Sequence, residues 1–302
     1  MSLNLVNPFM KFASGGGASW STADTSAMCM GGTNSPWTAG NVVETWNGSS
    51  WSAATGLPAN RLLLDGGGNS TDGISIGGDS GGTSAPTDDV YTWNGSAWTT
   101  HAAALGANTN MLAAGGTSTD AIWMGGSYSS LSTTQTYNGS SWTNVNNMNQ
   151  GRRGHNGDGN SPDAIVVGGY HDGTSTNLDS SETWDGSAWT YGTNFPNSYP
   201  NGQYGYGGGA GHTTNFLAQA QDRAIDNVWI YTGSGWTQTA NTTGGSVNYS
   251  GLGGDNTNTI KAGGSNGGWN ASTSELFDGT SWTATSGLNT GRAAMAMGGN
   301  TN

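Results

Sequence analysis

Short apolar runs of four or five residues alternate with polar, glycine-rich segments along nearly the whole chain. These runs end in paired glycines in "SAMCMGG", "GISIGG", "AIWMGG" and "AIVVGG", and an aromatic residue follows 11 to 15 residues after the second glycine. Runs of this length between glycines indicate β-strands, because a helix needs about ten residues or more. The pattern therefore predicts an all-β protein.

The segment "ETWNGSSW" (44–51) returns in six related copies. Each copy holds an aromatic residue and a tryptophan five residues later, and the first aromatic recurs at steps of 47, 44, 47, 47 and 46 residues. Steps of this size suit the blades of a β-propeller, which have four strands each. The pairs are Trp46 and Trp51, Trp93 and Trp98, Tyr137 and Trp142, Trp184 and Trp189, Tyr231 and Trp236, and Phe277 and Trp282.

The remainder of each repeat supplies two more strands. A double glycine ends one of them, with its second residue at Gly32, Gly78, Gly126, Gly169 and Gly264, whereas the fifth copy reads "NFLAQA". Another glycine stands ten residues earlier in most copies and closes a further strand, at Gly68, Gly116, Gly159 and Gly254. The unit thus reads strand a, turn, strand b, loop, strand c with the first aromatic, tight turn, and strand d with the tryptophan. It predicts six four-stranded blades.

The c–d turn contains Asn-Gly or Asp-Gly in five of the six copies, with Thr232-Gly233 as the weaker one. Positive φ angles are cheap for such residues, so we expect these pairs to close the c–d hairpins. The aromatic residues on either side are expected to pack between adjacent blades.

The two ends of the repeat array are complementary. The first copy begins with strand b in "DTSAMCMGG" (24–32), and the tail "GRAAMAMGGNTN" (291–302) matches strand a, with Arg292 ten residues after Trp282. Since unpaired sheet edges invite aggregation, we expect residues 292–300 to complete the first blade. An alternative strand a is "FMKFASGGG" (9–17), whose last glycine lies 15 residues before Gly32 instead of ten. The preferred reading gives an N-terminal arm, residues 1–23, and a propeller, residues 24–302.

The repeated double glycine, aromatic residue and tryptophan resemble the kelch family of β-propellers over about residues 24–302. The Asn-Gly turn is shorter than the usual kelch spacing before the tryptophan. Richness in Gly, Asn and Ser makes the chain most similar to the kelch-like propellers of marine bacteriophages. The resemblance implies six kelch-like blades and a place in a phage particle.

Composition restricts the partners. The chain of 302 residues has a net charge of −12 and only seven Lys and Arg. Nucleic-acid binding needs a basic surface, so we expect none. No run of about 18 apolar residues occurs, so membrane insertion is not expected either, and the first residues make a poor secretion signal. The single cysteine, Cys29, is expected to be a small buried apolar residue.

No constellation of catalytic or metal-binding residues stands out. The four histidines fall in different copies without metal-ligand spacing, and Glu44, Glu182 and Glu275 share one repeat position, which indicates a structural role. Four arginines, at the start of strand a in their copies, fit the same explanation: Arg61, Arg152, Arg153 and Arg292. We therefore expect no metal, no cofactor and no catalytic residue, and hence a protein that is not an enzyme.

The faces of the ring differ in variability. The c–d turns have one length, whereas the b–c and d–a connections, which share the other face, vary. Variable loops on a rigid scaffold are where recognition is usually found. Aromatic rings with neighbouring amides and hydroxyls suit sugars and proteins alike, and the candidate binding residues on this face are Trp37, Tyr128, Tyr170, Tyr191, Tyr199 and Trp269.

These observations favour a non-enzymatic structural or interaction protein of a bacteriophage virion. It would be a capsid decoration, fibre or tail component that attaches to other virion proteins through residues 1–23. Its propeller would bind a protein or a glycan of the host surface. The alternative is a lectin-like or adhesive bacterial extracellular protein, and a third reading is a glycan-active enzyme.

Overall fold

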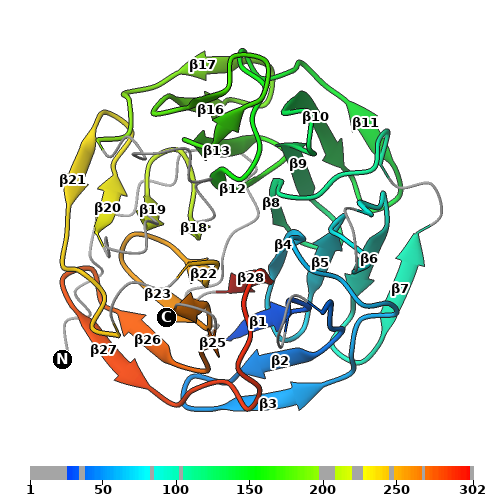
Figure 1. The fold of residues 1–302 in the computed structure, drawn as a ribbon, viewed down its shortest axis with the longest axis vertical. Coiled ribbons are helices and arrows are strands. Elements are labelled where there is room, and N and C mark those ends of the chain that lie inside the picture. The colour runs from blue at the N-terminus through cyan, green and yellow to red at the C-terminus, as the bar shows by residue number, and fades with distance from the viewer. Residues whose placement is uncertain are drawn as a thin grey trace, which may run out of the picture.

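Six antiparallel sheets of four strands stand around a central axis (Figure 1). This computed structural model describes residues 26–33, 38–81, 85–101, 105–196, 208–219, 227–244, 248–266 and 269–299, and these ranges contain strands and no helix. The fold is a six-bladed β-propeller, as the repeat predicts.

Each blade runs from an inner strand at the axis to an outer strand at the rim. The first blade consists of β28 (Ala296–Gly299), β1 (Ala27–Met30), β2 (Val43–Trp46) and β3 (Trp51–Ala54). The second contains β4 (Asp65–Gly68), β5 (Gly73–Ile76), β6 (Val90–Trp93) and β7 (Trp98–His101). The third contains β8 (Ala113–Gly116), β9 (Ala121–Gly126), β10 (Leu131–Tyr137) and β11 (Trp142–Asn144).

The other three blades follow in the same order from the axis outward. The fourth contains β12 (Asn156–Asn160), β13 (Asp163–Val167), β16 (Ser181–Trp184) and β17 (Trp189–Tyr191). The fifth contains β18 (Gly209–Ala210), β19 (Phe216–Gln219), β20 (Val228–Tyr231) and β21 (Trp236–Gln238). The sixth contains β22 (Gly251–Gly254), β23 (Thr259–Ala262), β26 (Ser274–Phe277) and β27 (Trp282–Thr285). Two small hairpins lie in b–c loops: β14 (Tyr170–His171) with β15 (Thr176–Asn177), and β24 (Ser265–Asn266) with β25 (Trp269–Asn270).

The C-terminal strand closes the ring. β28 pairs antiparallel with β1, with Ala27 opposite Gly299 and Met30 opposite Ala296. The expectation for residues 292–300 is therefore confirmed. β1 also pairs with β2, so both of its edges are occupied and the alternative strand at residues 9–17 was wrong. The proposed arm, residues 1–23, lies outside the described residues.

Glycines on the inner strands let the blades meet backbone to backbone at the axis. A Cβ atom added to Gly67 would lie 2.5 Å from the carbonyl oxygen of Gly116, and one added to Gly298 would lie 2.5 Å from the amide nitrogen of Gly68. Any side chain at these positions would separate neighbouring blades. This close approach explains the glycines at Gly67 and Gly298, whereas the recurring glycines Gly68 and Gly116 have φ angles of 105° and 109°, which favour glycine.

Six apolar clusters fill the interfaces between neighbouring blades. One joins Trp46 and Trp51 of the first blade to Ile260 and Ala262 of the sixth. Five of the six outer tryptophans also bond to the preceding blade, as when Trp189 Nε1 donates to Thr134 Oγ1 at 3.0 Å, whereas Trp142 Nε1 has no partner among the described residues. The expectation that the repeated aromatics pack between blades is confirmed, and so is the burial of Cys29, which is fully enclosed.

The c–d turns are held by hydrogen bonds to the side-chain oxygen of Asn or Asp, and that residue does not adopt a positive φ. Trp46 pairs with Trp51, which leaves a four-residue loop in which Gly48 has φ 94° while Asn47 has no positive φ. Asn47 Oδ1 instead accepts the N–H groups of Ser49 and Ser50, both at 3.0 Å. The same bonds recur at Asn94, Asn138, Asp185 and Asp278. The Asx residue is therefore selected for its acceptor oxygen.

Candidate functional site

The candidate functional site lies on the face of the ring that carries the b–c loops and the d–a connections. At the axis the six inner strands enclose a cavity of about 80 Å³. Every blade contributes to its lining, through residues such as Asp65, Ala114, Asp158, Gly209, Leu252 and Met297.

Two buried carboxyl groups tie neighbouring blades together at this cavity. Asp65 Oδ2 accepts the N–H of Ala114 at 2.8 Å, and Asp158 Oδ2 accepts the N–H of Gly211 at 3.0 Å. Loss of water on burial raises the pKa of Asp158 to about 6, and burial raises the pKa of Asp65 well above its usual value. The axis therefore holds carboxyl groups that keep their protons at mildly acidic pH.

His155 is a neutral part of the same wall. Burial, and secondarily the charge of Arg152, holds the pKa of His155 well below its usual value. Its Nε2 donates to the carbonyl oxygen of Met124 at 3.1 Å. The bond links blade four to blade three.

A second polar group lies beside this cavity, between blades three and four. We call Tyr128, Arg153, Tyr170 and Asp172 the Arg153 cluster. Arg153 binds Asp172 through two parallel bonds, Nε to Oδ2 at 2.7 Å and Nη2 to Oδ1 at 2.9 Å. Its Cζ lies 5.2 Å from the ring centre of Tyr170 and 5.9 Å from that of Tyr128. Both distances are within the range of a cation–π contact, so one guanidinium brings the two rings together.

Tyr128 connects the Arg153 cluster to a buried acid of blade two. Its hydroxyl donates to Asp79 Oδ2 at 3.1 Å, and Asn110 Nδ2 donates to the same oxygen at 2.8 Å. Asp79 Oδ1 and Asn110 Oδ1 are buried without a hydrogen-bond partner. Blades two, three and four thus all contribute to one polar group on this face.

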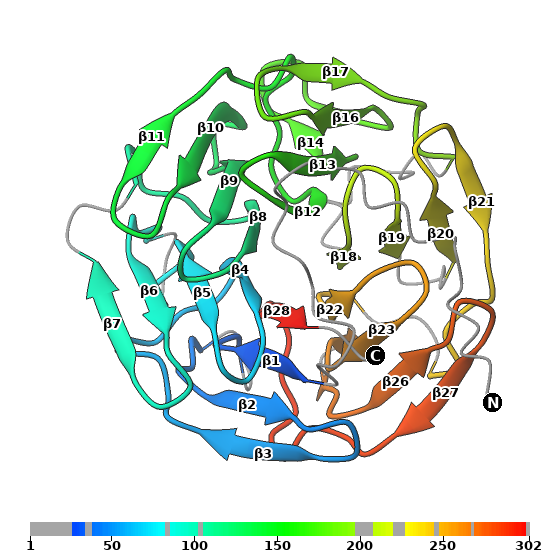
Figure 2. The same cartoon turned by 180° about the vertical axis from the view of Figure 1, so that it is seen from behind.

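Backbone bonds fix the Arg153 cluster to the scaffold. Arg153 N–H donates to Tyr170 O at 3.1 Å, and Tyr170 N–H donates to Arg153 O at 2.9 Å. Ser130 Oγ donates to Asp172, and it accepts the Asp172 N–H at 3.0 Å. The hairpin β14–β15 carries Tyr170 and His171, and its first strand, β14, is labelled beside β13 and β16 in Figure 2.

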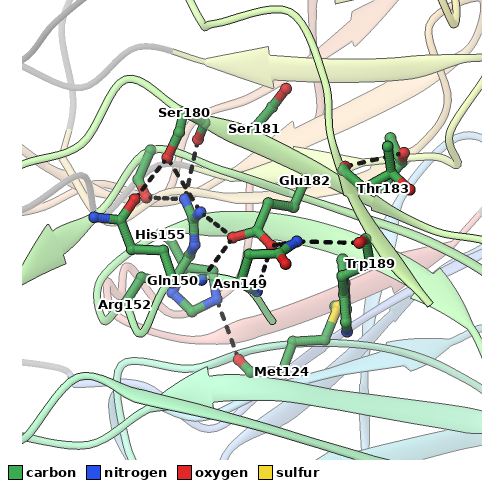
Figure 3. Close-up of polar contacts among 12 residues, drawn as sticks. Met124, Asn149, Gln150, Arg152, His155, Ser180, Ser181, Glu182, Thr183 and Trp189 are labelled. Atoms are coloured by element: carbon green, nitrogen blue, oxygen red, sulfur yellow. Dashed lines mark hydrogen bonds and ion pairs between the residues drawn. The ribbon is translucent and has the colours of Figure 1, made fainter. Parts of the chain in front are cut away.

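The other three arginines among the described residues serve the scaffold. Arg152 and Glu182 are fully buried, and Nη2 donates to Oε1 at 2.6 Å while Nη1 donates to the carbonyl oxygen of Gly168 at 2.8 Å (Figure 3). Arg292 binds Glu44 in the same way at 2.8 Å, and Arg61 binds Asp89. Each of these arginines pairs with an acid of its own blade, so they do not converge on one site.

The predicted binding residues separate into several groups. Tyr128, 40% exposed, and Tyr170 belong to the Arg153 cluster. Tyr191, 55% exposed, lies on the outer strand β17, and Trp269 lies in β25, paired with Asn266. Trp37 and Tyr199 lie outside the described residues.

Sequence reasoning missed the role of Arg153, and of Asp172 and Asp79 as well. The available signal was the doubled arginine at 152–153. One arginine fills the repeat position, and the second has no counterpart in the other copies.

The described part of the chain has no helix whose length and hydropathy would let it cross a membrane. It also has no group of three or more His, Cys, Asp or Glu side chains placed to hold a metal ion.

The fold defines the class of protein, a six-bladed β-propeller, and comparison with known proteins agrees. No protein-family model matches the chain, and no curated protein matches it. The solved structure of YjhT is similar, with a TM-score of 0.64 and 11% identity over 85% of this chain and 99% of that one. At this identity the likeness shows the fold alone.

Our expectation that this chain is not an enzyme is corrected, because the β-propeller fold that it shares with YjhT does not exclude an enzyme. That expectation rested on repeat positions, which explain the scaffold, and one fold hosts many functions through side chains added to it. The Arg153 cluster is an addition of this kind, since the repeat does not account for it. The exclusion of an enzyme was therefore wrong.

Proposed function

We propose that this chain is a recognition propeller of a bacteriophage particle, where it is a capsid decoration, fibre or tail component that binds a host-surface glycan at the Arg153 cluster. The observation that carries the binding site is the pair of tyrosine rings gathered on one arginine beside the axial cavity. Support for the virion comes from the Gly-, Asn- and Ser-rich repeats, which resemble kelch-like phage propellers, and residues 1–23 are proposed to contact other virion proteins.

The chemistry of the cluster suits a sugar. Tyr128 offers an exposed ring whose hydroxyl is already bonded to Asp79, so the ring is held in place before a ligand arrives. His171 accepts the N–H of Thr174 with Nδ1 at 3.2 Å, which leaves its Nε2 as a hydrogen-bond donor. Apolar surface with a few fixed polar groups is typical of small-molecule sites. Because the side chains are bonded in advance, a ligand loses little binding energy to ordering them.

The second candidate is a bacterial extracellular lectin-like or adhesive protein. It would use the same rings and the same loops, and the exposed Tyr128 favours it equally. The two candidates differ in what the propeller is attached to, because only a virion protein binds to phage particles. Co-sedimentation of the full chain and of a variant without residues 1–23 with phage particles distinguishes them, since only the virion protein requires that partner.

The binding site is tested with the full chain and glycans from host cells. Tyr128→Ala is expected to weaken binding by tenfold or more, as for an aromatic anchor. Tyr191→Ala is the matched control, because this exposed tyrosine lies on the outer strand β17. Unchanged binding by the Tyr128 variant, or an equal loss in the control, would place recognition elsewhere. Release of shortened glycans during the assay would identify a glycan-active enzyme.

A further inference from the structure

We propose that the Arg153 cluster selects glycans without carboxylate or sulfate groups, and that it prefers amino sugars to neutral sugars. The inference rests on the proposed function and adds the class of ligand. It follows from how the charges beside the two tyrosine rings are already paired.

Arg153 presents its two-donor edge, Nε and Nη2, to Asp172 and not to an acidic sugar. Its Nε and Nη2 are bonded to Asp172, its Nη1 lies 3.5 Å from Met111 Sδ, and both tyrosine rings lie within 6 Å of its Cζ. An incoming carboxylate would have to displace Asp172, which Ser130 also holds. Arginine is normally the residue that recognises acidic ligands by two parallel bonds, and here a protein carboxylate takes that place.

Asp172 remains charged, so it cancels the charge of Arg153. The bonds from Arg153, together with that from Ser130, hold the pKa of Asp172 below its usual value. The pair therefore contributes no net positive charge to the site at neutral pH.

Asp79 makes the site negative. Its Oδ2 is bonded to Tyr128 and Asn110, which are neutral, and its buried Oδ1 has no partner. Among the described residues, no Lys, Arg or His forms an ion pair with Asp79. A charge in such surroundings is weakly screened, so it attracts an ammonium group and repels a carboxylate. The net charge of −12 acts in the same direction.

The test compares methyl glycosides of gluco-, galacto- and mannopyranose, each in its neutral, 2-amino and uronic acid form. Binding to the full chain is measured by calorimetry or ligand-observed NMR. For the sugar that binds best, the amine form is expected to bind at least threefold more tightly than the neutral form, and the uronic acid at least tenfold more weakly. Tighter or equal binding of the uronic acid, with Tyr128→Ala still abolishing it, overturns the inference and leaves the proposed function intact. Absence of binding by every form overturns both.

Two variants assign the preference to its causes. Asp172→Asn frees the guanidinium of Arg153 and is expected to improve uronic acid binding tenfold or more. Asp79→Asn is expected to remove the preference for the amine. Asp185→Asn is the control: it changes the net charge equally, lies in a c–d turn, and restores the residue that three other copies have there. A selectivity change as large in this control as in Asp79→Asn contradicts the assignment, and if a variant fails to fold, the wild-type order of the three forms still decides.

Discussion

Replacing Arg152 by threonine is expected to be among the most damaging single changes in this ring. The third blade already has that residue, because Thr109 occupies the position of Arg152 and Gln135 that of Glu182. Blade three thus shows the uncharged version of an arrangement that blade four builds from a buried ion pair.

The expected loss of unfolding free energy follows from the hydrogen bonds that Arg152 and Glu182 form. Arg152 donates to the carbonyl oxygens of Gly168 and Ser180 at 2.8 and 3.0 Å, and to Glu182 at 2.6 Å, with both charged side chains 0% exposed. Without the arginine, Glu182 keeps three bonds from two neighbouring residues but has no opposite charge. Leaving one charge of a buried pair uncompensated costs about 3–5 kcal/mol of unfolding free energy.

The double variant Arg152→Thr/Glu182→Gln should recover part of this loss, because it removes the stranded charge. The expected coupling is about 2 kcal/mol. Urea unfolding followed by fluorescence gives each free energy, and the chain has 14 tryptophans to report it. The corresponding set in the first blade, Arg292→Thr with Glu44→Gln, serves as a replicate. A loss below about 1 kcal/mol for Arg152→Thr, or a double variant no better than the sum of its parts, would refute the reasoning.

Three other predictions concern the axis, the turns and the closure. Burial raises the pKa of Asp158 from 3.8 to about 6, so its stabilising effect is complete below pH 3.8 and is lost as the pH rises through 6. Over that interval the unfolding free energy of the wild type should fall by about 3 kcal/mol relative to that of Asp158→Asn. Urea titrations at several pH values check this, because the neighbouring Asp65, His155 and His212 are the same in both proteins. Asn138→Ala should cost about 1 kcal/mol because two N–H groups lose their acceptor, whereas Asn138→Asp should cost less than about 0.5 kcal/mol; thermal melts compare them. Deleting residues 291–302 should expose the edge of β1 and cause aggregation in size-exclusion chromatography, whereas deleting 300–302 should leave a monodisperse protein.

The blades could be predicted from the sequence because each copy meets the same steric constraints. The axis admits glycine where Gly67 faces Gly116, and each blade interface needs its aromatic pair. The prediction is least complete for blade five, because β18 has only two residues and β19 ends without the double glycine. A repeat identifies what every copy requires, and blade five departs from it.

The candidate site could be predicted only in part, because its contacts do not recur from copy to copy. The sequence predicts Tyr128 and Tyr170 as binding residues because they are aromatic and lie in variable loops, which does not indicate which residues lie between them. The bonds from Arg153 to Asp172, and from Tyr128 to Asp79, join positions that no other copy uses in this way. Such contacts depend on how three blades are placed around the axis, which spacing along the chain does not encode.

A partial ring of backbone hydrogen bonds around the axis, described for five of the six blades, connects the scaffold to the site. Two residues before the inner strand, the N–H of one blade donates to the carbonyl oxygen of the preceding blade: Leu63 to Ala294 at 2.9 Å, Met111 to Leu63 at 2.9 Å, Gly154 to Met111 at 2.7 Å and Ala294 to Tyr249 at 3.0 Å. All five residues have φ between 51° and 61°. For a residue with a side chain this conformation costs roughly 1–2 kcal/mol, yet four of the five are not glycine. The bonds and the packing of the ring must offset that cost.

Met111 belongs both to this ring and to the surroundings of Arg153. Its backbone bonds to Leu63 and Gly154, and its sulfur lies 3.5 Å from Arg153 Nη1. Arg153 is the residue directly before Gly154, so the cluster is attached to the axial ring at two consecutive blades. Ala294, in the C-terminal segment, joins Tyr249 to Leu63 in that ring. Loss of this segment should therefore loosen the Arg153 cluster on blades three and four as well as the first blade, because the bonds that position the cluster run around the axis.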